Sequence, residues 1–256
     1  MFKTDLSFRP PLMNAAGMLG FAPDVHAVFN SFPAGSWDDL GAFVTNPISL
    51  RPRRAAANPK MIQYPGGLLL HTGLPNPGFT SVIKKYSRRW ASTRLPVIVH
   101  LMADRPEETA RMVRSLEGLE NIAAVELGFA PLLAADIIQI AVEMSLGELP
   151  LIANLPFEQV LSLGPRLIQS GAAALSFAAP RGSLPISSSE PDEPWSTVTG
   201  RIYGPGLFSQ SLALLNSAIR LGLPVIGGVG VYSRDQASVM LASGALAVQL
   251  DTFLWK

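Results

Sequence analysis

Leu223-Pro-Val-Ile-Gly-Gly-Val-Gly-Val231 and Ser243-Gly-Ala-Leu-Ala-Val-Gln-Leu-Asp-Thr252 are the two stretches that decide the fold. Each contains a short apolar run of the kind found in strands that are buried on both faces. After the first run, Ser233 and Gln236 have the capping-box spacing of a helix start. A strand, a glycine turn and a helix N-terminus together offer free N–H groups and a favourable dipole to a phosphate. In (β/α)₈ barrels, such a site often lies between the loops after strands seven and eight.

The earlier chain supplies six further strand-like runs, which makes eight in all. The runs are 11–17, 41–46, 96–101, 123–127, 150–154, 173–177, 224–226 and 246–250, and helical patterns lie between them at 24–32, 81–90, from 104, 132–146, 157–170, 208–221 and from 233. This alternation indicates a parallel sheet, and 256 residues match the roughly 250 of one barrel. We predict an α/β fold, a (β/α)₈ TIM barrel, in a single domain over residues 1–256. The eighth helix is predicted to be missing, because the chain stops at Lys256.

Two long excursions interrupt the alternation, at residues 47–79 and 178–203. The first is rich in Pro, Gly and Arg, and the second in Ser, Pro and Glu. Loops of this length are uncommon and usually functional. We expect both on the end of the barrel that carries the glycine loops, where barrel enzymes place their sites. Residues 1–8 alternate weakly, which predicts a small hairpin strand before the barrel.

The composition excludes several classes of protein. A formal net charge of +1 argues against a nucleic-acid or membrane-surface partner. The absence of cysteine excludes disulfides, thiolate metal sites and a Cys nucleophile. The N-terminus has no signal-peptide pattern, and acidic residues interrupt the longest apolar stretch, 122–144, so we expect a cytoplasmic protein without a membrane span. No His, Asp and Glu cluster has metal-ligand spacing, so we predict no metal.

Four motifs resemble those of one enzyme family in order and spacing. They are Pro11-Leu-Met-Asn-Ala-Ala-Gly17, Gly73-Leu-Pro-Asn-Pro-Gly-Phe79, Gly200-Arg-Ile-Tyr-Gly-Pro-Gly206 and the last fifty residues. Nearly the whole chain resembles the dihydroorotate dehydrogenase family, FMN-dependent (β/α)₈ barrels of pyrimidine biosynthesis. The resemblance implies that FMN would contact Ala15, Ala16, Gly17, Thr45, Asn46, Asn154, Gly204, Gly228, Val229, Gly230, Asp251 and Thr252. It also implies a substrate loop that includes Gly73, Leu74 and Asn76.

The sequence departs from the family at the positions that carry its chemistry. Two family lysines beside the flavin, after strand two and at strand five, correspond to Asn46 and Asn154. After strand four, the stretch 126–132 is one residue shorter and lacks the Cys or Ser base that takes a carbon-bound proton. Substrate-binding amides of the family correspond to Leu70 and Leu132. We therefore assign no catalytic residue and predict a degenerate site that does not oxidise dihydroorotate.

Two further departures concern the phosphate. Val229 stands at the first of two adjacent family glycines, and we expect that it cannot use the positive-φ conformations open to Gly. Asp251 replaces a Gly or Tyr and would place a carboxylate close to the phosphate. FMN is therefore predicted to bind weakly or not at all. The alternative is an FMN-dependent oxidoreductase of the same family type, acting in pyrimidine synthesis or on another substrate.

Several residues admit two interpretations. His71 and His100 form a proton-transfer pair in one, and are a loop residue and a satisfied strand histidine in the other. Glu126 is either a base or a structural acid inside a strand, and the arginines of 51–54 either hold an acidic ligand or are solvated. A barrel without its eighth helix exposes an apolar flank, which predicts a homo-oligomer or a partner subunit. A small-molecule ligand is compatible with all of these interpretations.

Overall fold

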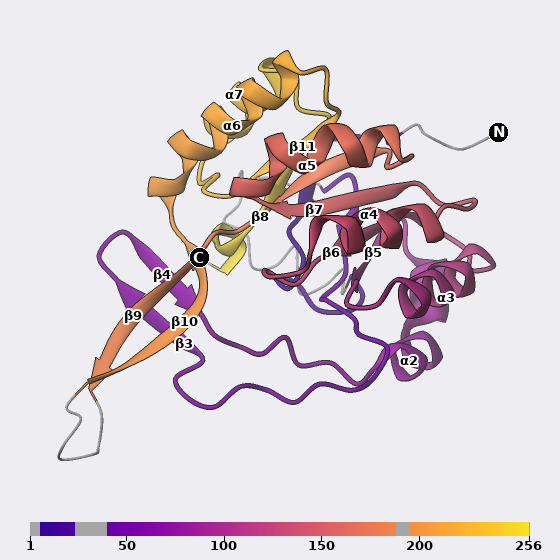
Figure 1. Cartoon of the computed structure of the whole chain (residues 1–256), viewed down its shortest axis with the longest axis horizontal. Coiled ribbons are helices and arrows are strands. Elements are labelled where there is room, and N and C mark those ends of the chain that lie inside the picture. Colours follow the sequence, from indigo (N-terminus) through magenta and orange to yellow (C-terminus); the bar gives the residue numbers. More distant parts are fainter. Residues whose placement is uncertain (1–5, 24–39, 188–194, 256) are drawn as a thin grey trace.

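The computed structural model describes residues 6–23, 40–187 and 195–255, which form a parallel barrel and a smaller antiparallel sheet beside it (Figure 1). The barrel order is β1-β12-β11-β8-β7-β6-β5-β2, and a parallel bridge between Met13 and Ala42 closes it. The strands are β1 (Leu12–Asn14), β2 (Phe43–Val44), β5 (Val97–Met102), β6 (Ile122–Gly128), β7 (Leu151–Pro156), β8 (Ala174–Ala178), β11 (Val225–Gly228) and β12 (Ala247–Leu250). The predicted (β/α)₈ barrel is confirmed.

The inside of the barrel is filled by one apolar layer in which large and small side chains alternate. In barrel order its members are Met13, Ala247, Ile226, Ala174, Ile152, Ala124, Ile98 and the pair Ala42 and Val44. Successive strand residues point to opposite faces, so each of the other strands contributes one residue to this layer, while Ala42 and Val44, two residues apart, both face it. Leu6 and Phe8 pack against the same layer, and neither lies in a strand. The predicted hairpin strand is therefore wrong for residues 6–8, and residues 1–5 lie outside the described part.

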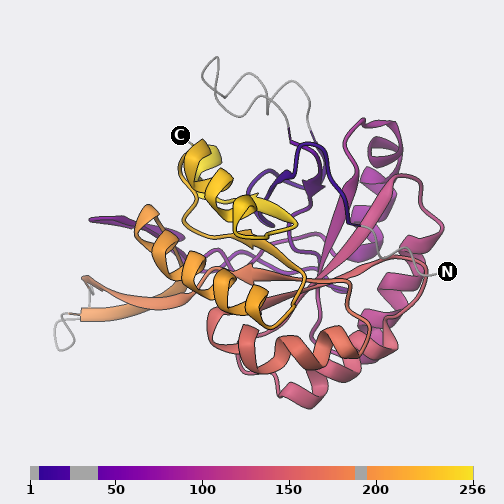
Figure 2. The same cartoon turned by 90° about the horizontal axis from the view of Figure 1, so that it is seen from above.

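Helices cover the outside of the barrel (Figure 2). They are α2 (Phe79–Ser92), α3 (Pro106–Glu117), α4 (Ala135–Met144), α5 (Phe157–Gln169), α6 (Phe208–Arg220) and α7 (Arg234–Ala242), with 3₁₀ turns η1 (Pro205–Leu207) and η2 (Thr252–Trp255). The predicted cap of α7 is confirmed, because the Ser233 hydroxyl accepts the Gln236 amide at 3.2 Å. The predicted helix at 24–32 lies outside the described residues. None of the helices described is long and apolar enough to cross a membrane.

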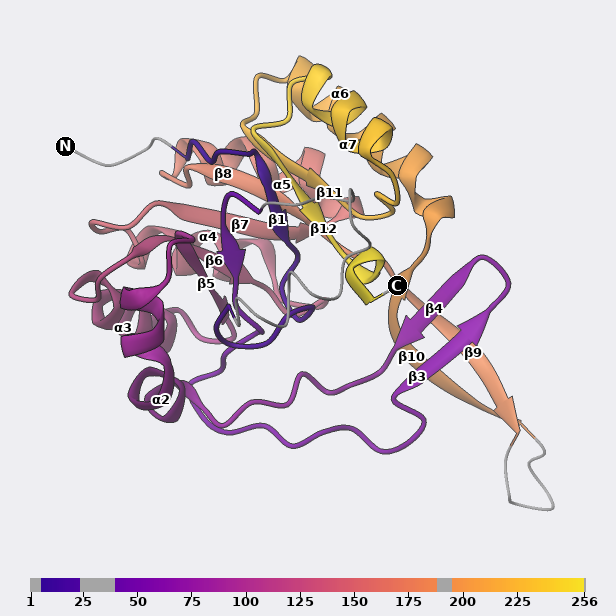
Figure 3. The same ribbon diagram turned by 180° about the vertical axis from the view of Figure 1, so that it is seen from behind.

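The two excursions contain strands that pair with each other, which the sequence did not predict. The strands β3 (Met61–Tyr64), β4 (Gly67–Leu70), β9 (Arg181–Ser187) and β10 (Trp195–Tyr203) form a four-stranded antiparallel sheet in the order β3-β4-β10-β9. Leu70 of β4 is the register partner of Arg201 of β10. Figure 3 shows this sheet projecting from one side of the barrel. The joint between β4 and β10 therefore holds two distant chain segments together.

The close approach at this joint gives a stability prediction. A Cβ on Gly200 would clash with the Leu70 carbonyl oxygen and lie 2.7 Å from Leu69 Cδ2, whereas a Cβ on Gly206 would meet no atom within 4 Å. We expect Gly200→Ala to lower the free energy of unfolding by about 1–3 kcal/mol, as overpacking does. Urea unfolding measures this loss, and tryptic cleavage at Lys60 and Arg181 should become faster. Equal stability of Gly200→Ala and the control Gly206→Ala would contradict the pairing.

Candidate functional site

A cavity of about 470 Å³ lies where the carboxyl ends of the barrel strands meet the four-stranded sheet. Its barrel side includes Asn46, His100, Gly128, Asn154, Gln249 and Asp251, and its sheet side includes Leu70, His71, Arg181, Thr199 and Arg201. Both excursions thus border the same end of the barrel as the glycine loops, as predicted. The position is the one at which barrel enzymes build their active sites.

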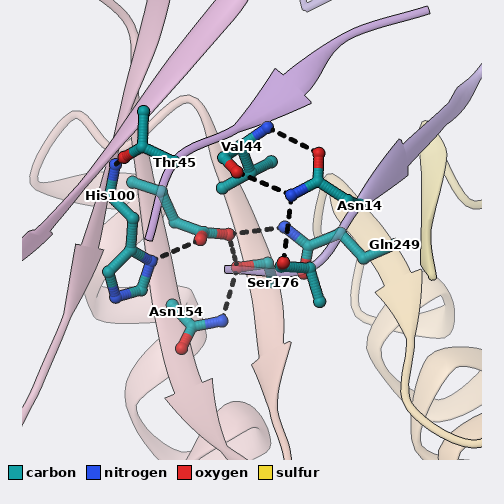
Figure 4. Close-up of polar contacts among 9 residues, drawn as sticks. Asn14, Val44, Thr45, His100, Asn154, Ser176 and Gln249 are labelled. Atoms are coloured by element: carbon teal, nitrogen blue, oxygen red, sulfur yellow. Dashed lines mark hydrogen bonds and ion pairs between the residues drawn. The ribbon is translucent and has the colours of Figure 1, made fainter. Parts of the chain in front are cut away.

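A polar layer lies inside the barrel, two residues beyond the apolar layer along five of the strands. Glu126 of β6 is its centre, because it is fully buried and accepts three side-chain hydrogen bonds. His100 Nδ1 lies 2.6 Å from one carboxylate oxygen, and Ser176 Oγ and Gln249 Nε2 donate to the other at 2.6 and 2.7 Å. The Asn154 amide donates to Ser176 Oγ at 2.9 Å, and Figure 4 shows these side chains converging. One carboxylate therefore joins side chains from five strands.

Glu126 carries the negative charge of this layer. Burial by itself raises the pKa of its carboxyl, but the hydrogen bond and charge of His100 and the bonds from Ser176 and Gln249 outweigh it. The net effect holds the pKa of Glu126 below its usual value of 4.5. A carboxylate with three donors is the arrangement expected to stay ionised inside a protein. Glu126 is therefore a buried acid inside the barrel, and it contacts His100.

The side chains of Asn14 and Thr45 each link two strands of the barrel. The Asn14 side chain accepts from the Val44 amide at 3.0 Å and donates to the Val44 carbonyl at 2.6 Å, which links the edge strands β1 and β2. The Thr45 hydroxyl accepts the His100 backbone amide at 3.0 Å. Thr45 is fully buried and does not line the cavity. Its contacts in the structure are therefore with the barrel itself.

At the glycine turn where a phosphate was predicted, one backbone amide bonds a side chain of the protein. Asp251 Oδ2 accepts the Gly230 backbone amide at 3.0 Å, and Asp251 is almost fully buried. Burial raises the pKa of Asp251, while hydrogen bonds from the backbone of Gly230, Phe253 and Thr252 and from the Thr252 hydroxyl offset part of that rise. The Thr252 hydroxyl also lies 2.5 Å from the Tyr232 hydroxyl. The N–H of Gly230, which would bind a phosphate, thus has an internal anionic partner.

Val229 corrects one expectation from the sequence. Its φ is +65°, so it does adopt the left-handed conformation that we expected only glycine to use. A β-branched residue is rare there, and such backbone costs about 1–3 kcal/mol unless its surroundings enforce it. Val229 is buried in the outer core cluster, and Gly230 beside it, with φ +80°, has no room for a Cβ near Phe208 N. Packing on both sides therefore holds the turn in this conformation.

The structure brings most of the predicted contact residues together. Ala15, Ala16, Gly17, Asn46, Gly73, Leu74, Asn154, Val229 and Asp251 line the cavity, whereas Thr45, Asn76, Gly204, Gly228, Gly230 and Thr252 do not. Asn76 is buried and its Oδ1 accepts the Ser49 and Gly78 amides at 3.3 and 3.0 Å, so it shapes the loop. Asn46 Oδ1 accepts the Gly20 amide at 3.0 Å. The binding roles themselves stay predictions.

The other candidate residues lie at different places relative to the cavity. His71 Nδ1 lies 2.8 Å from the Thr199 carbonyl oxygen, so this histidine links the two excursions. Leu132 is 99% exposed and does not line the cavity, so the expectation that it replaces a substrate amide is wrong in position. Of the arginines of 51–54, only Arg53 lines the cavity. Within the described ranges, no group of three His, Asp or Glu side chains could hold a metal ion.

Three residues that line the cavity were not predicted from the sequence. Gln249 lies in the polar layer, Arg181 extends from β9, and Trp255 donates its Nε1 hydrogen to the Met18 carbonyl at 2.9 Å. Gln249 could have been found from the sequence, because it is a polar residue within an apolar strand. Such a residue faces either the helices outside the barrel or the barrel interior. No sequence pattern indicated Arg181 or Trp255. Arg181 reaches the cavity through the pairing of β9 with β10, and Trp255 through the 3₁₀ turn η2.

The depressed pKa of Glu126 gives a pH prediction. A carboxyl whose folded pKa lies below its unfolded value stabilises the fold above the unfolded pKa and loses that contribution as pH falls through the folded value. At neutral pH we expect Glu126→Gln to lower the free energy of unfolding by about 1–3 kcal/mol. The gap from wild type should shrink from about pH 4.5 downward. Urea unfolding between about pH 3 and 7 measures it; exposed Glu120→Gln is the control, and a pH-independent gap would contradict the assignment.

Comparison with known proteins agrees with this architecture. The dihydroorotate dehydrogenase family model matches residues 3–130. The chain is 26% identical to dihydroorotate dehydrogenase B (NAD(+)), catalytic subunit, of Trichlorobacter lovleyi, over 96% of this chain and 84% of the relative. It is also 26% identical to the protein of the same name in Geotalea uraniireducens, over 98% of this chain and 88% of the relative. The chain belongs to the dihydroorotate dehydrogenase family.

Proposed function

We propose that this protein is a dihydroorotate dehydrogenase-like barrel that binds a small molecule but does not oxidise dihydroorotate, and that it binds FMN weakly or not at all. The observation that carries the proposal is the contact of Asp251 with the Gly230 amide at 3.0 Å. That contact fills the position at which the family resemblance would place the phosphate. The cavity remains large enough for a small ligand, at about 470 Å³.

The residues present do not fit the phosphate of FMN. A phosphate would compete with Asp251 for the Gly230 amide and would meet a buried carboxylate. Two unit charges about 4 Å apart repel by about 4 kcal/mol at an effective dielectric constant of about 20. Half of that repulsion already corresponds to about a thirtyfold loss of affinity. The Val229 turn does not add to this penalty, because it already has a positive φ.

At the positions given by the family resemblance, the cavity also lacks the groups that dihydroorotate oxidation needs. The stretch Gly128, Phe129 and Ala130 carries no side chain that can take a proton. Asn46 and Asn154 are uncharged where the family has lysines, so they cannot balance negative charge on a reduced flavin. The Asn154 amide is moreover engaged by Ser176 at 2.9 Å. These contacts support a site that has lost the family reaction.

One observation favours a second candidate function. The cavity is still lined by Ala15, Ala16 and Gly17, which belong to the first-strand motif that the family places beneath the flavin. An FMN-dependent oxidoreductase with another substrate is therefore the alternative. The relatives are named as catalytic subunits of dihydroorotate dehydrogenase B, and this name supports a partner subunit or a second copy of the chain beside the barrel.

Flavin titration tests the role of Asp251. We expect wild type to bind FMN weakly and Asp251→Gly to bind it about thirtyfold more tightly, because the substitution removes half or more of the repulsion. Fluorescence quenching of FMN measures both constants, and Asp235→Gly controls for a general loss of negative charge. Equal binding by wild type and Asp251→Gly, whether tight or weak, would show that the carboxylate does not control the site.

An anaerobic assay tests the loss of the family reaction. Wild type given excess FMN and dihydroorotate should leave the flavin oxidised, because the base at the family's position and both flavin-facing lysines are missing. General-base catalysis by a correctly placed group is alone worth about 10²–10⁴ in rate, or about 3–5 kcal/mol of barrier. Flavin absorbance follows the reaction without any added electron acceptor. Rapid bleaching by dihydroorotate would contradict the proposal and favour the oxidoreductase alternative.

A further inference from the structure

We propose that the His100 imidazole is the proton acceptor of the cavity, that Glu126 positions it, and that the ligand is a small molecule with a weakly acidic O–H or N–H. This inference rests on the proposed binding of a small molecule in the same cavity, and it holds whether or not FMN binds. It rests on the direction of the hydrogen bonds in the polar layer, on the place of the ring in the cavity and on the charges around it.

The Glu126 carboxylate fixes the direction of the hydrogen bonds around it. An ionised carboxylate can only accept, so Ser176 Oγ and Gln249 Nε2 both donate to it. The Asn154 amide nitrogen then donates to Ser176 Oγ, whose own hydrogen is already used. For the same reason His100 donates its Nδ1 hydrogen to Glu126 at 2.6 Å. A neutral imidazole with its hydrogen on Nδ1 carries a lone pair on Nε2.

The Nε2 atom faces the cavity. His100 lines the cavity, and its Nε2 has no hydrogen-bond partner among the residues that the structure describes. A Cβ on Gly128 would clash with Nε2 and lie 2.8 Å from Cε1 of the same ring. Glycine at position 128 therefore leaves the space that the imidazole occupies.

The surroundings suit a proton transfer from a weak acid. The proton leaves the ligand oxygen or nitrogen for Nε2, the ligand keeps the electron pair as an anion, and the resulting imidazolium is balanced by Glu126 at 2.6 Å. The other charged or titratable groups that line the cavity are Arg53, His71, Asp104, Arg181, Arg201, Tyr203 and Asp251. Arginines outnumber acids in this set, and Asp251 is already engaged by Gly230. The cavity can therefore hold the anion that forms.

His71 provides the contrast within the same cavity. Its Nδ1 contacts the Thr199 backbone carbonyl rather than a carboxylate, and it lies on the four-stranded sheet rather than in the barrel. A carbonyl orients a histidine but does not stabilise its charge as an anion does. Only His100 combines an oriented ring with a buried carboxylate among the histidines described. His100 is therefore the histidine that the geometry assigns as the proton acceptor.

The test uses 4-nitrophenol, whose ionised form absorbs at a longer wavelength than the neutral form. At a pH where free 4-nitrophenol is mostly protonated, wild type should produce the phenolate band in proportion to bound probe. His100→Gln should abolish the band, and Glu120→Gln, at an exposed position away from the cavity, should keep it. 4-Nitroanisole, which has no acidic hydrogen, should compete poorly. Absence of the band in wild type, or its persistence in His100→Gln, would overturn the proposal.

The variant Glu126→Gln tests whether Glu126 positions His100 or only packs inside the barrel. A Gln carbonyl would stay with its two donors, Ser176 and Gln249, and would turn its NH₂ group toward His100 Nδ1. The imidazole would then carry its hydrogen on Nε2 and lose its lone pair there. The phenolate band should fall strongly, because Nε2 would no longer accept a proton and no carboxylate would balance an imidazolium. An unchanged band in folded Glu126→Gln would contradict the positioning role.

A second measurement needs no variant, which matters if Glu126→Gln does not fold. The ¹⁵N chemical shifts of the imidazole ring report which nitrogen carries the hydrogen. In wild type at mildly alkaline pH, His100 should show a protonated Nδ1 and an unprotonated Nε2. A hydrogen on Nε2 alone would overturn the proposal whatever the probe shows.

Discussion

The interaction on which the cavity depends is the burial of the Glu126 carboxylate inside the barrel. An unpaired buried charge is strongly unfavourable, so a charge at this position requires donors around it. His100, Ser176 and Gln249 supply them from β5, β8 and β12. These contacts set the orientation of every polar side chain in the layer. The geometry of the cavity is therefore a consequence of how one carboxylate is satisfied.

Asp251 is a second buried carboxyl group, and it lines the cavity. Its contact with the Gly230 amide gives the glycine turn a partner supplied by the chain itself. A backbone amide at such a turn is otherwise free to bind an external anion. The two carboxyl groups therefore have different partners: Glu126 bonds a histidine, and Asp251 bonds a backbone amide of the glycine turn. Together they support a family member with changed binding chemistry.

The barrel could be predicted from sequence because its signals are local. Each strand is a short apolar run, and the Ser233 cap of α7 is a pattern over four residues. The four-stranded sheet was missed, because Leu70 and Arg201 pair across more than a hundred residues. The positive φ of Val229 was also missed, since packing around the turn imposes it. The sequence identified Asp251, but only the structure shows that its carboxylate turns back to Gly230.

A charged Glu126 orders the polar layer and leaves a lone pair on His100 Nε2. Neutron diffraction of the deuterated protein at mildly alkaline pH tests it most directly, because it locates each exchangeable hydrogen. We predict no deuterium on Glu126, one on His100 Nδ1, and none on His100 Nε2. Deuterium on the Glu126 carboxyl, or on Nε2 in place of Nδ1, would contradict this account.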